Sequence, residues 1–107
     1  ASAPAAELAG NFGSAERDWR KAAELSRNPR SILTLQAAAW RNVGRLGEWN
    51  RATDALLDLV RVAGQDVPEV QLEAAFAAYQ AGRLDTASEL AQSLNGTYRS
   101  IYEGRIR

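Results

Sequence analysis

Two short stretches share a pattern of glycine, large apolar residue and alanine, and this pattern constrains the fold more than any other feature. Residues 45–52 have the sequence RLGEWNRA, and residues 80–87 have the sequence QAGRLDTA. The shared positions are Gly47, Trp49 and Ala52 in the first stretch, and Gly82, Leu84 and Ala87 in the second. Because glycine commonly ends helices, each stretch predicts a tight turn between two helices.

Helices are predicted on both sides of these turns. Hydrophobic residues make up 46% of the 107 residues, many of them alanine, and only three residues are proline, which favours helix over sheet. Apolar residues recur at steps of three and four, as in Ile32, Leu35 and Ala39. We therefore predict an all-α fold of five or six helices, in which residues 1–13 are a flexible lead-in and residues 14–107 form a single domain.

Serine and glycine residues predict where the helices start and end. Ser14 and Ser31 are suited to cap the first two helices, because a serine hydroxyl accepts hydrogen bonds from the free N–H groups of a first turn. Gly10 and Gly13 are expected to interrupt any helix in the lead-in. The predicted helices cover residues 14–28, 31–46, 48–63, 68–81, 84–94 and 97–107.

The 35-residue spacing of the two turn glycines resembles that of the tetratricopeptide repeat, a helix pair of about 34 residues. The resemblance places repeat units at residues 33–66 and 68–101, and a capping helix at residues 97–107. It implies a right-handed stack of antiparallel helix pairs. Trp40 departs from the pattern, because it stands where the family has a small residue.

In this family the first helices of successive units line a concave groove. The resemblance places in that groove Arg41, Arg45, Leu72, Phe76 and Tyr79. It implies a non-enzymatic adaptor that binds a peptide or a partner helix, as family members do in bacterial secretion and envelope assembly. The positions that form a carboxylate clamp in chaperone-binding members are Ala37, Leu72 and Glu73 here, so such a clamp is not expected.

Several interpretations of these residues stay open. Leu72, Phe76 and Tyr79 form one stripe on a helix, which either receives an apolar side chain of a partner or is core covered by the chain's own first or last helix. Arg41 and Arg45 lie four residues apart, and they either bind a carboxylate or phosphate, form a solvated helix face, or pair with nearby acids. A further alternative is a structural segment that self-associates into a homo-oligomer, since a short array exposes apolar ends.

Composition argues against most catalytic chemistry. The chain has no histidine and no cysteine, so the usual zinc sites, Ser–His–Asp triads and Cys–His pairs cannot form. Two carboxylate pairs, Asp54 with Asp58 and Glu69 with Glu73, are interpreted as exposed helix charge. We expect no metal and no cofactor, and an enzyme subunit is the remaining alternative.

Charge and hydropathy narrow the classes of partner. Thirteen basic residues balance thirteen acidic ones, so no net field attracts nucleic acid. No apolar run reaches the roughly 20 residues that span a bilayer, so direct membrane insertion is not expected. Trp19, Trp40 and Trp49 are interpreted as packing residues rather than stacking sites for bases or sugars. Arginine outnumbers lysine by twelve to one, which is typical of a GC-rich bacterial source, and the compartment stays open between cytoplasm and periplasm.

Overall fold

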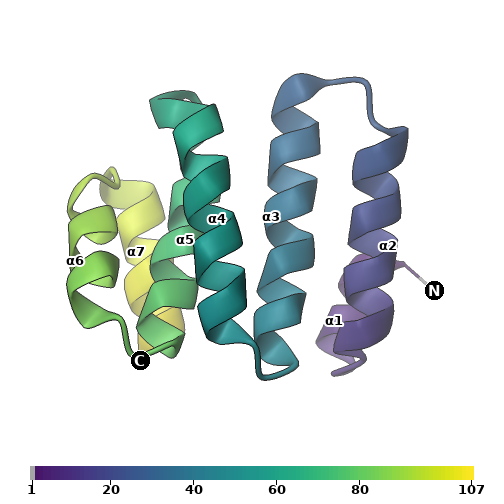
Figure 1. Ribbon diagram of the computed structural model, residues 1–107, viewed down its shortest axis with the longest axis horizontal. Helices are drawn as coiled ribbons and strands as arrows, with labels where there is room; N and C mark the ends of the chain where they lie inside the picture. Colours follow the sequence, from purple (N-terminus) through teal and green to yellow (C-terminus); the bar gives the residue numbers. More distant parts are fainter. Residues whose placement is uncertain (1) are drawn as a thin grey trace.

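A computed structural model describes residues 2–107, and these residues form seven α-helices joined by short turns (Figure 1). The helices are α1 (Ala3–Leu8), α2 (Phe12–Leu25), α3 (Pro29–Arg45), α4 (Trp49–Ala63), α5 (Pro68–Gln80), α6 (Leu84–Gln92) and α7 (Gly96–Ile106), with a short 3-10 helix, η1 (Gly64–Asp66), between α4 and α5. The predicted all-α fold is confirmed. The predicted number of five or six helices is wrong, because the segment interpreted as a flexible lead-in contains α1 and the start of α2.

Local capping explains why α1 forms. The Ser2 hydroxyl accepts a hydrogen bond from a backbone N–H of the first turn at 3.4 Å, and Pro4 lies in that turn, where its missing N–H is not needed. The helix packs against α2 and ends at a turn in which Gly10 has a φ of +82°. Gly13 lies inside α2, so only one of the two glycines predicted to interrupt a helix does so.

Asparagine and proline, rather than the predicted serine, begin α3. Asn28 Oδ1 accepts a hydrogen bond from the N–H of Ser31 at 3.1 Å. Pro29 occupies the first helical position, where its fixed φ suits a helix and its missing N–H has no partner to lose. Ser14 likewise lies inside α2, which begins at Phe12. Both helices therefore start two residues earlier than predicted.

Three turns share one backbone geometry. Gly10, Gly47 and Gly82 have φ values of +82°, +105° and +78°, which glycine adopts without the steric cost of a Cβ. In each turn the glycine N–H donates to the carbonyl three residues before it, and the next N–H donates to the carbonyl five residues before it, as in a Schellman motif. The next helix starts two residues after each glycine, at Phe12, Trp49 and Leu84.

The turn at Gly10 is a third copy of the pattern seen at Gly47 and Gly82. Phe12 and Ala15 follow Gly10 at the same two- and five-residue spacings, and the three turn glycines lie 37 and 35 residues apart. The alanine five residues after each glycine is at most 1% exposed in all three copies. The described residues therefore form three helix hairpins, α1–α2, α3–α4 and α5–α6, followed by α7.

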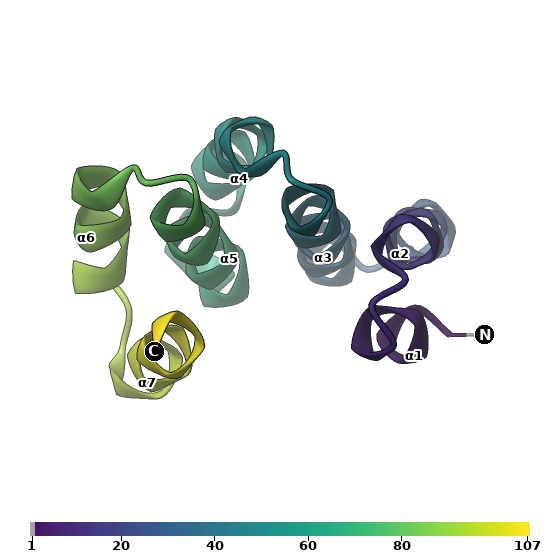
Figure 2. The same cartoon turned by 90° about the horizontal axis from the view of Figure 1, so that it is seen from below.

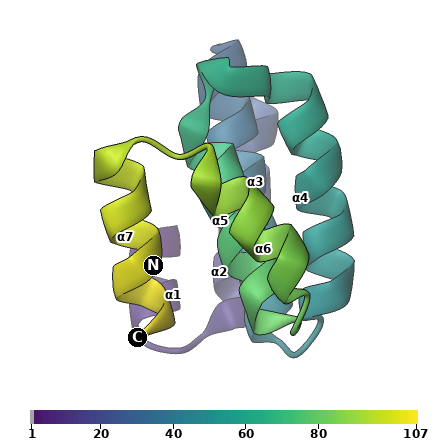
Figure 3. The same cartoon turned by 90° about the vertical axis from the view of Figure 1, so that its left-hand side faces the viewer.

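The helices form an arch (Figure 2). α4 lies at the top of the arch, while α1 and α7 lie at its two feet and on the same side of the molecule, as Figure 3 also shows. α3 and α5 pack against each other between these feet. We call the surface bounded by α1, α3, α5 and α7 the inner face. The first helix of every hairpin thus contributes to one surface.

α5 is the centre of the hydrophobic core. It packs against α3, α4, α6 and α7, and every residue from Val70 to Ala78 is buried. Most of these residues are apolar and lie on every side of the helix, so α5 needs such cover all round. The core has two clusters, one that includes Leu56 and Val70 between α4 and α5, and one that includes Leu72, Phe76 and Tyr102 between α5 and α7.

Trp49 packs against both core clusters. Its ring meets the ring of Phe76 edge-on, with centroids 5.5 Å apart and planes at 87°. It also covers Gly44 of α3 so closely that a Cβ on this glycine would lie 2.1 Å from Trp49 Cε3. The predicted packing role of Trp49 therefore depends on a glycine in the facing helix.

Candidate binding face

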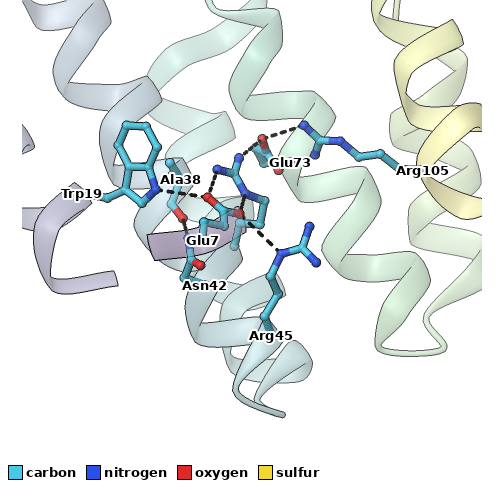
Figure 4. Close-up of polar contacts among 8 residues, drawn as sticks. Glu7, Trp19, Ala38, Asn42, Arg45, Glu73 and Arg105 are labelled. Atoms are coloured by element: carbon cyan, nitrogen blue, oxygen red, sulfur yellow. Dashed lines mark hydrogen bonds and ion pairs between the residues drawn. The ribbon is translucent and has the colours of Figure 1, made fainter. Parts of the chain in front are cut away.

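A chain of ion pairs crosses the inner face from α1 to α7 (Figure 4). Glu7 of α1, Arg41 of α3, Glu73 of α5 and Arg105 of α7 alternate in charge, and each side chain contacts the next. Arg41 donates to Glu7 at 2.6 and 2.8 Å and to Glu73 at 2.5 Å. Arg105 donates to both oxygens of Glu73 at 2.7 and 3.3 Å. These pairs link the four helices that bound the inner face.

The ion pairs at the middle of this chain are largely shielded from water. The side chains of Glu7, Arg41 and Glu73 are only 15%, 14% and 9% exposed. Charges removed from water in this way need close partners, and removing one partner is strongly destabilising. Glu7 also accepts a hydrogen bond from Trp19 Nε1 at 3.2 Å, so α2 contributes to its position.

The pKa values of Glu7 and Arg41 show whether burial or ion pairing dominates. Burial acts to raise the pKa of Glu7, but hydrogen bonds and charge from Arg41, with the further hydrogen bond from Trp19, outweigh it and lower the pKa from 4.5 to about 2. Burial acts to lower the pKa of Arg41, but Glu7 and Glu73 outweigh it and raise that pKa. Both groups are therefore charged at neutral pH, and the contact between α1 and α3 is an ionic one.

Arg45 lies beside this chain of ion pairs but is not fully paired. Its Nε is 3.4 Å from Glu7 Oε2, an oxygen that already accepts from Arg41 at 2.6 Å, and the Arg45 side chain donates no hydrogen bond to any other group within residues 2–107. Its guanidinium instead lies 5.6 Å from the ring centroid of Phe12 and 5.8 Å from that of Phe76. One third of the side chain is exposed.

A hollow of about 600 Å³ opens beside Arg45. Side chains from α1, α2, α3 and α7 line it, among them Phe12, Trp19 and all three arginines of the inner face. Leu8, at the end of α1, also lines it and is 92% exposed. The hollow therefore combines aromatic and aliphatic surface with guanidinium groups.

The predicted groove residues do not all lie on one surface. Arg41 and Arg45 line the hollow, and Arg41 also pairs with nearby acids, one of the roles left open for it. Leu72 and Phe76 are 4% and 3% exposed and are packed beneath α7. Tyr79 is 37% exposed. Two of the three residues in the apolar stripe thus lie in the core, covered by the chain's own last helix.

A second hollow, of about 400 Å³, lies between α2, α3 and α4 and contains Trp40. The guanidinium groups of Arg20 and Arg51 lie 6.0 and 5.5 Å from the Trp40 ring centroid. Each of these arginines pairs with an acid close in sequence, Glu16 at 3.0 Å and Glu48 at 3.4 Å. Because both of its arginines are paired locally, this hollow is a weaker candidate than the one on the inner face.

The carboxylate pairs do not converge on a shared site. Three of the four acids form separate ion pairs: Asp54 with Arg83 at 2.7 Å, Glu69 with Arg30 at 2.9 Å, and Asp58 with Arg61. Glu73 is the exception to the predicted exposed charge, because its side chain is 9% exposed. Among residues 2–107, no group of three or more acidic side chains is placed to hold a metal ion.

Glu7, Phe12 and Arg105 are residues of this face that are not predicted from the sequence. The spacing of Gly10, Phe12 and Ala15 is a signal that could identify the first hairpin, and with it Phe12. No local pattern marks Glu7 or Arg105, because their ion-pair partners lie 34 and 32 residues away in the chain.

Comparison of the chain with protein-family models, with curated proteins and with solved structures found no match in any of the three. None of the helices formed by residues 2–107 has the length and hydropathy needed to span a membrane.

Proposed function

We propose that this chain is a non-enzymatic protein-interaction module, a right-handed stack of helix hairpins similar to tetratricopeptide repeats, and that its inner face holds a segment of a partner protein. The turn pattern at Gly10, Gly47 and Gly82 supports a repeated hairpin unit. Stacked hairpin repeats place equivalent helices side by side and so build extended binding surfaces. The side-by-side position of α1, α3, α5 and α7 suits such a surface (Figure 2).

The hollow beside Arg45 is the observation that carries this proposal. Its lining residues come from α1, α2, α3 and α7, so a ligand in the hollow contacts several helices at once. Exposed Leu8 and the ring of Phe12 offer apolar contacts, while the guanidinium groups offer hydrogen-bond donors. A peptide supplies both kinds of partner along one strand or helix.

Selection of peptide ligands tests the proposal. A display library of random dodecapeptides is selected on the wild-type protein, and affinities of enriched peptides are measured by fluorescence anisotropy for Leu8→Gln and Leu25→Gln. Leu25, which is 73% exposed and does not line the hollow, is a matched control. We expect the Leu8 variant to bind about tenfold more weakly, because a buried leucine contributes about 1.5–3 kcal/mol, and the Leu25 variant to bind like the wild type.

Two results would contradict this function. A library that yields no peptide with measurable affinity argues against a peptide-binding face. Selected peptides that lose the same affinity with either variant bind somewhere other than the hollow. Because both leucines are highly exposed, neither substitution is expected to unfold the protein.

Self-association is a second candidate, supported by exposed apolar residues on the last two helices. Leu84 of α6 is 58% exposed and Ile101 of α7 is 42% exposed. Ile101 belongs to a helix with few neighbours, since α7 packs mainly on α5. Sedimentation over a concentration series distinguishes this candidate: association that is lost in Ile101→Gln supports it, and a monomer at all concentrations removes it.

A further inference from the structure

The cluster of ion pairs on the inner face carries one more positive charge than negative charge. Three arginines, Arg41, Arg45 and Arg105, meet two acids, Glu7 and Glu73, in a single connected cluster. A partly buried cluster with an unbalanced charge attracts a counter-ion, because water solvates it less well than it solvates fully exposed charges. The excess is one unit, which matches a carboxylate better than a doubly charged phosphate.

The excess charge is located on Arg45. Arg41 donates three hydrogen bonds to the two acids, and Arg105 donates two to Glu73. Arg45 has only the 3.4 Å contact with Glu7, and the Glu7 oxygen concerned is already bonded to Arg41. The guanidinium of Arg45 thus keeps donors that no other group within residues 2–107 uses.

Two aromatic rings position this guanidinium for a ligand. The Arg45 group lies 5.6 Å from the Phe12 centroid and 5.8 Å from the Phe76 centroid. Phe76 is 3% exposed and fixed in the core, so it restricts where the guanidinium can move. A guanidinium that is ordered before binding loses less side-chain entropy when it forms the paired hydrogen bonds to a carboxylate.

We infer that Arg45 is the anion receptor of the inner face and that it binds the side-chain carboxylate of an aspartate or glutamate within a bound peptide. This inference rests on the proposed peptide-binding function. Arg45 lies on α3, between the two feet of the arch, so a segment that crosses from α1 to α7 brings an internal residue to it rather than a chain end. Leu8 and Phe12, which line the same hollow, receive an apolar residue next to the acid.

The test uses a peptide enriched from the dodecapeptide library, together with a copy in which its acidic residue is replaced by the corresponding amide. Affinities are measured for the wild type, Arg45→Gln, Arg45→Lys and the control Arg51→Gln, whose arginine does not line this hollow. We expect Arg45→Gln to weaken binding of the acidic peptide by ten- to hundredfold and Arg45→Lys by less. The amide peptide should bind wild type and Arg45→Gln equally weakly, and Arg51→Gln should bind like the wild type.

Each other outcome overturns the inference in a recognisable way. Peptides that bind the hollow without a preference for an acid, or with equal affinity to Arg45→Gln, refute the role of Arg45 and leave the proposed function standing. A loss of affinity when only the peptide C-terminus is amidated shows that a terminal carboxylate is the ligand. Failure of all peptides to bind the wild type refutes both proposals. Melting curves of each variant confirm that folded protein is compared.

Discussion

The α3–α4 and α5–α6 hairpins have the same turn but use the residue after it differently. Gly47 and Gly82 both have positive φ, and both turns have the same pair of backbone hydrogen bonds. Trp49 nevertheless packs on Gly44 and against Phe76, whereas Leu84 in the equivalent position is 58% exposed. The turn motif therefore determines the backbone path, and the neighbouring helices determine whether the next side chain is buried.

The residue three positions before each turn glycine explains part of this difference. It is Gly44 in the second hairpin, where its lack of a side chain admits the Trp49 ring. It is Tyr79 in the third hairpin and Glu7 in the first. The Glu7 side chain instead reaches the ion pairs of the inner face. One position in the hairpin thus serves close packing in one copy and charge pairing in another.

Truncating the residue after each turn tests the comparison most strongly. We expect Trp49→Ala to lower the free energy of unfolding by about 3–5 kcal/mol, as for other large aromatic residues in cores. We expect Leu84→Ala to change it by no more than about 0.5 kcal/mol, because the side chain is largely exposed. Urea unfolding measures both, and equal losses would show that the two positions are equivalent after all.

Acidification tests how much the charged form of Glu7 stabilises the first hairpin position. Because the folded-state pKa of Glu7 is lowered from 4.5 to about 2, its stabilising effect is present above pH 4.5 and is lost as the pH falls toward 2. At 1.36 kcal/mol per pKa unit, the free energy of unfolding of the wild type should exceed that of Glu7→Gln by about 3 kcal/mol at neutral pH. Urea unfolding at several pH values should show the difference shrinking below pH 4.5. A difference that stays constant with pH would contradict the ionic interpretation.

Adding one methyl group at Gly44 tests the close contact with Trp49. The new Cβ would lie 2.1 Å from the ring, so α3 and α4 must separate, and we expect Gly44→Ala to cost about 2 kcal/mol. Gly104→Ala is the matched control, because Gly104 lies in α7 and, apart from its chain neighbours and the backbone of α7, no atom lies within 4 Å of its Cβ position. Helix propensity predicts a gain of up to about 1 kcal/mol for the control.

A double substitution separates this clash from a general effect on α3. In Trp49→Leu the smaller side chain leaves room for a Cβ, so adding Gly44→Ala to it should cost less than Gly44→Ala costs in the wild type. Additive losses in the double variant would indicate that the Trp49 ring is not the source of the effect.

Substituting either turn glycine should lower the stability of the protein by a similar amount. Apart from the chain neighbours, no atom lies within 4 Å of a Cβ at Gly47 or Gly82, so only the positive φ opposes an alanine. We expect Gly47→Ala and Gly82→Ala each to cost about 1–2 kcal/mol in thermal or urea unfolding. Asparagine tolerates this backbone region better and should cost less at both sites. A loss of stability at only one of the two turns would show that their backbone conformations differ in energy.

Much of the fold follows from local sequence signals. The turns at Gly47 and Gly82 and the helices around them are predicted, because their hydrogen bonds join residues at most five apart. Boundaries are less accurate at α2 and α3, where Asn28 and Pro29 rather than Ser31 begin the helix. α1 is missed although Gly10 carries the same spacing signal as the later turns, because the small residues around it resemble a flexible segment.

The candidate site is predictable only in part. Helix periodicity and the resemblance to a repeat family select Arg41 and Arg45, and both line the hollow. The same reasoning cannot decide whether Phe76 is groove or core, because that depends on where α7 packs. Arg105 and Glu7 carry no local signal, since an ion pair between distant residues exists only after the helices have assembled.

The sequence by itself determines the helix hairpins, since glycine at positive φ and the alanines that follow act through contacts within one turn or one helix pair. Only the tertiary structure decides which side chains remain available for binding. α7 covers Leu72 and Phe76, and α1 brings Glu7 to Arg41, which leaves Arg45 as the guanidinium without a hydrogen bond in the cluster on the inner face. These outcomes depend on packing between residues far apart in the chain, and no local propensity encodes that packing.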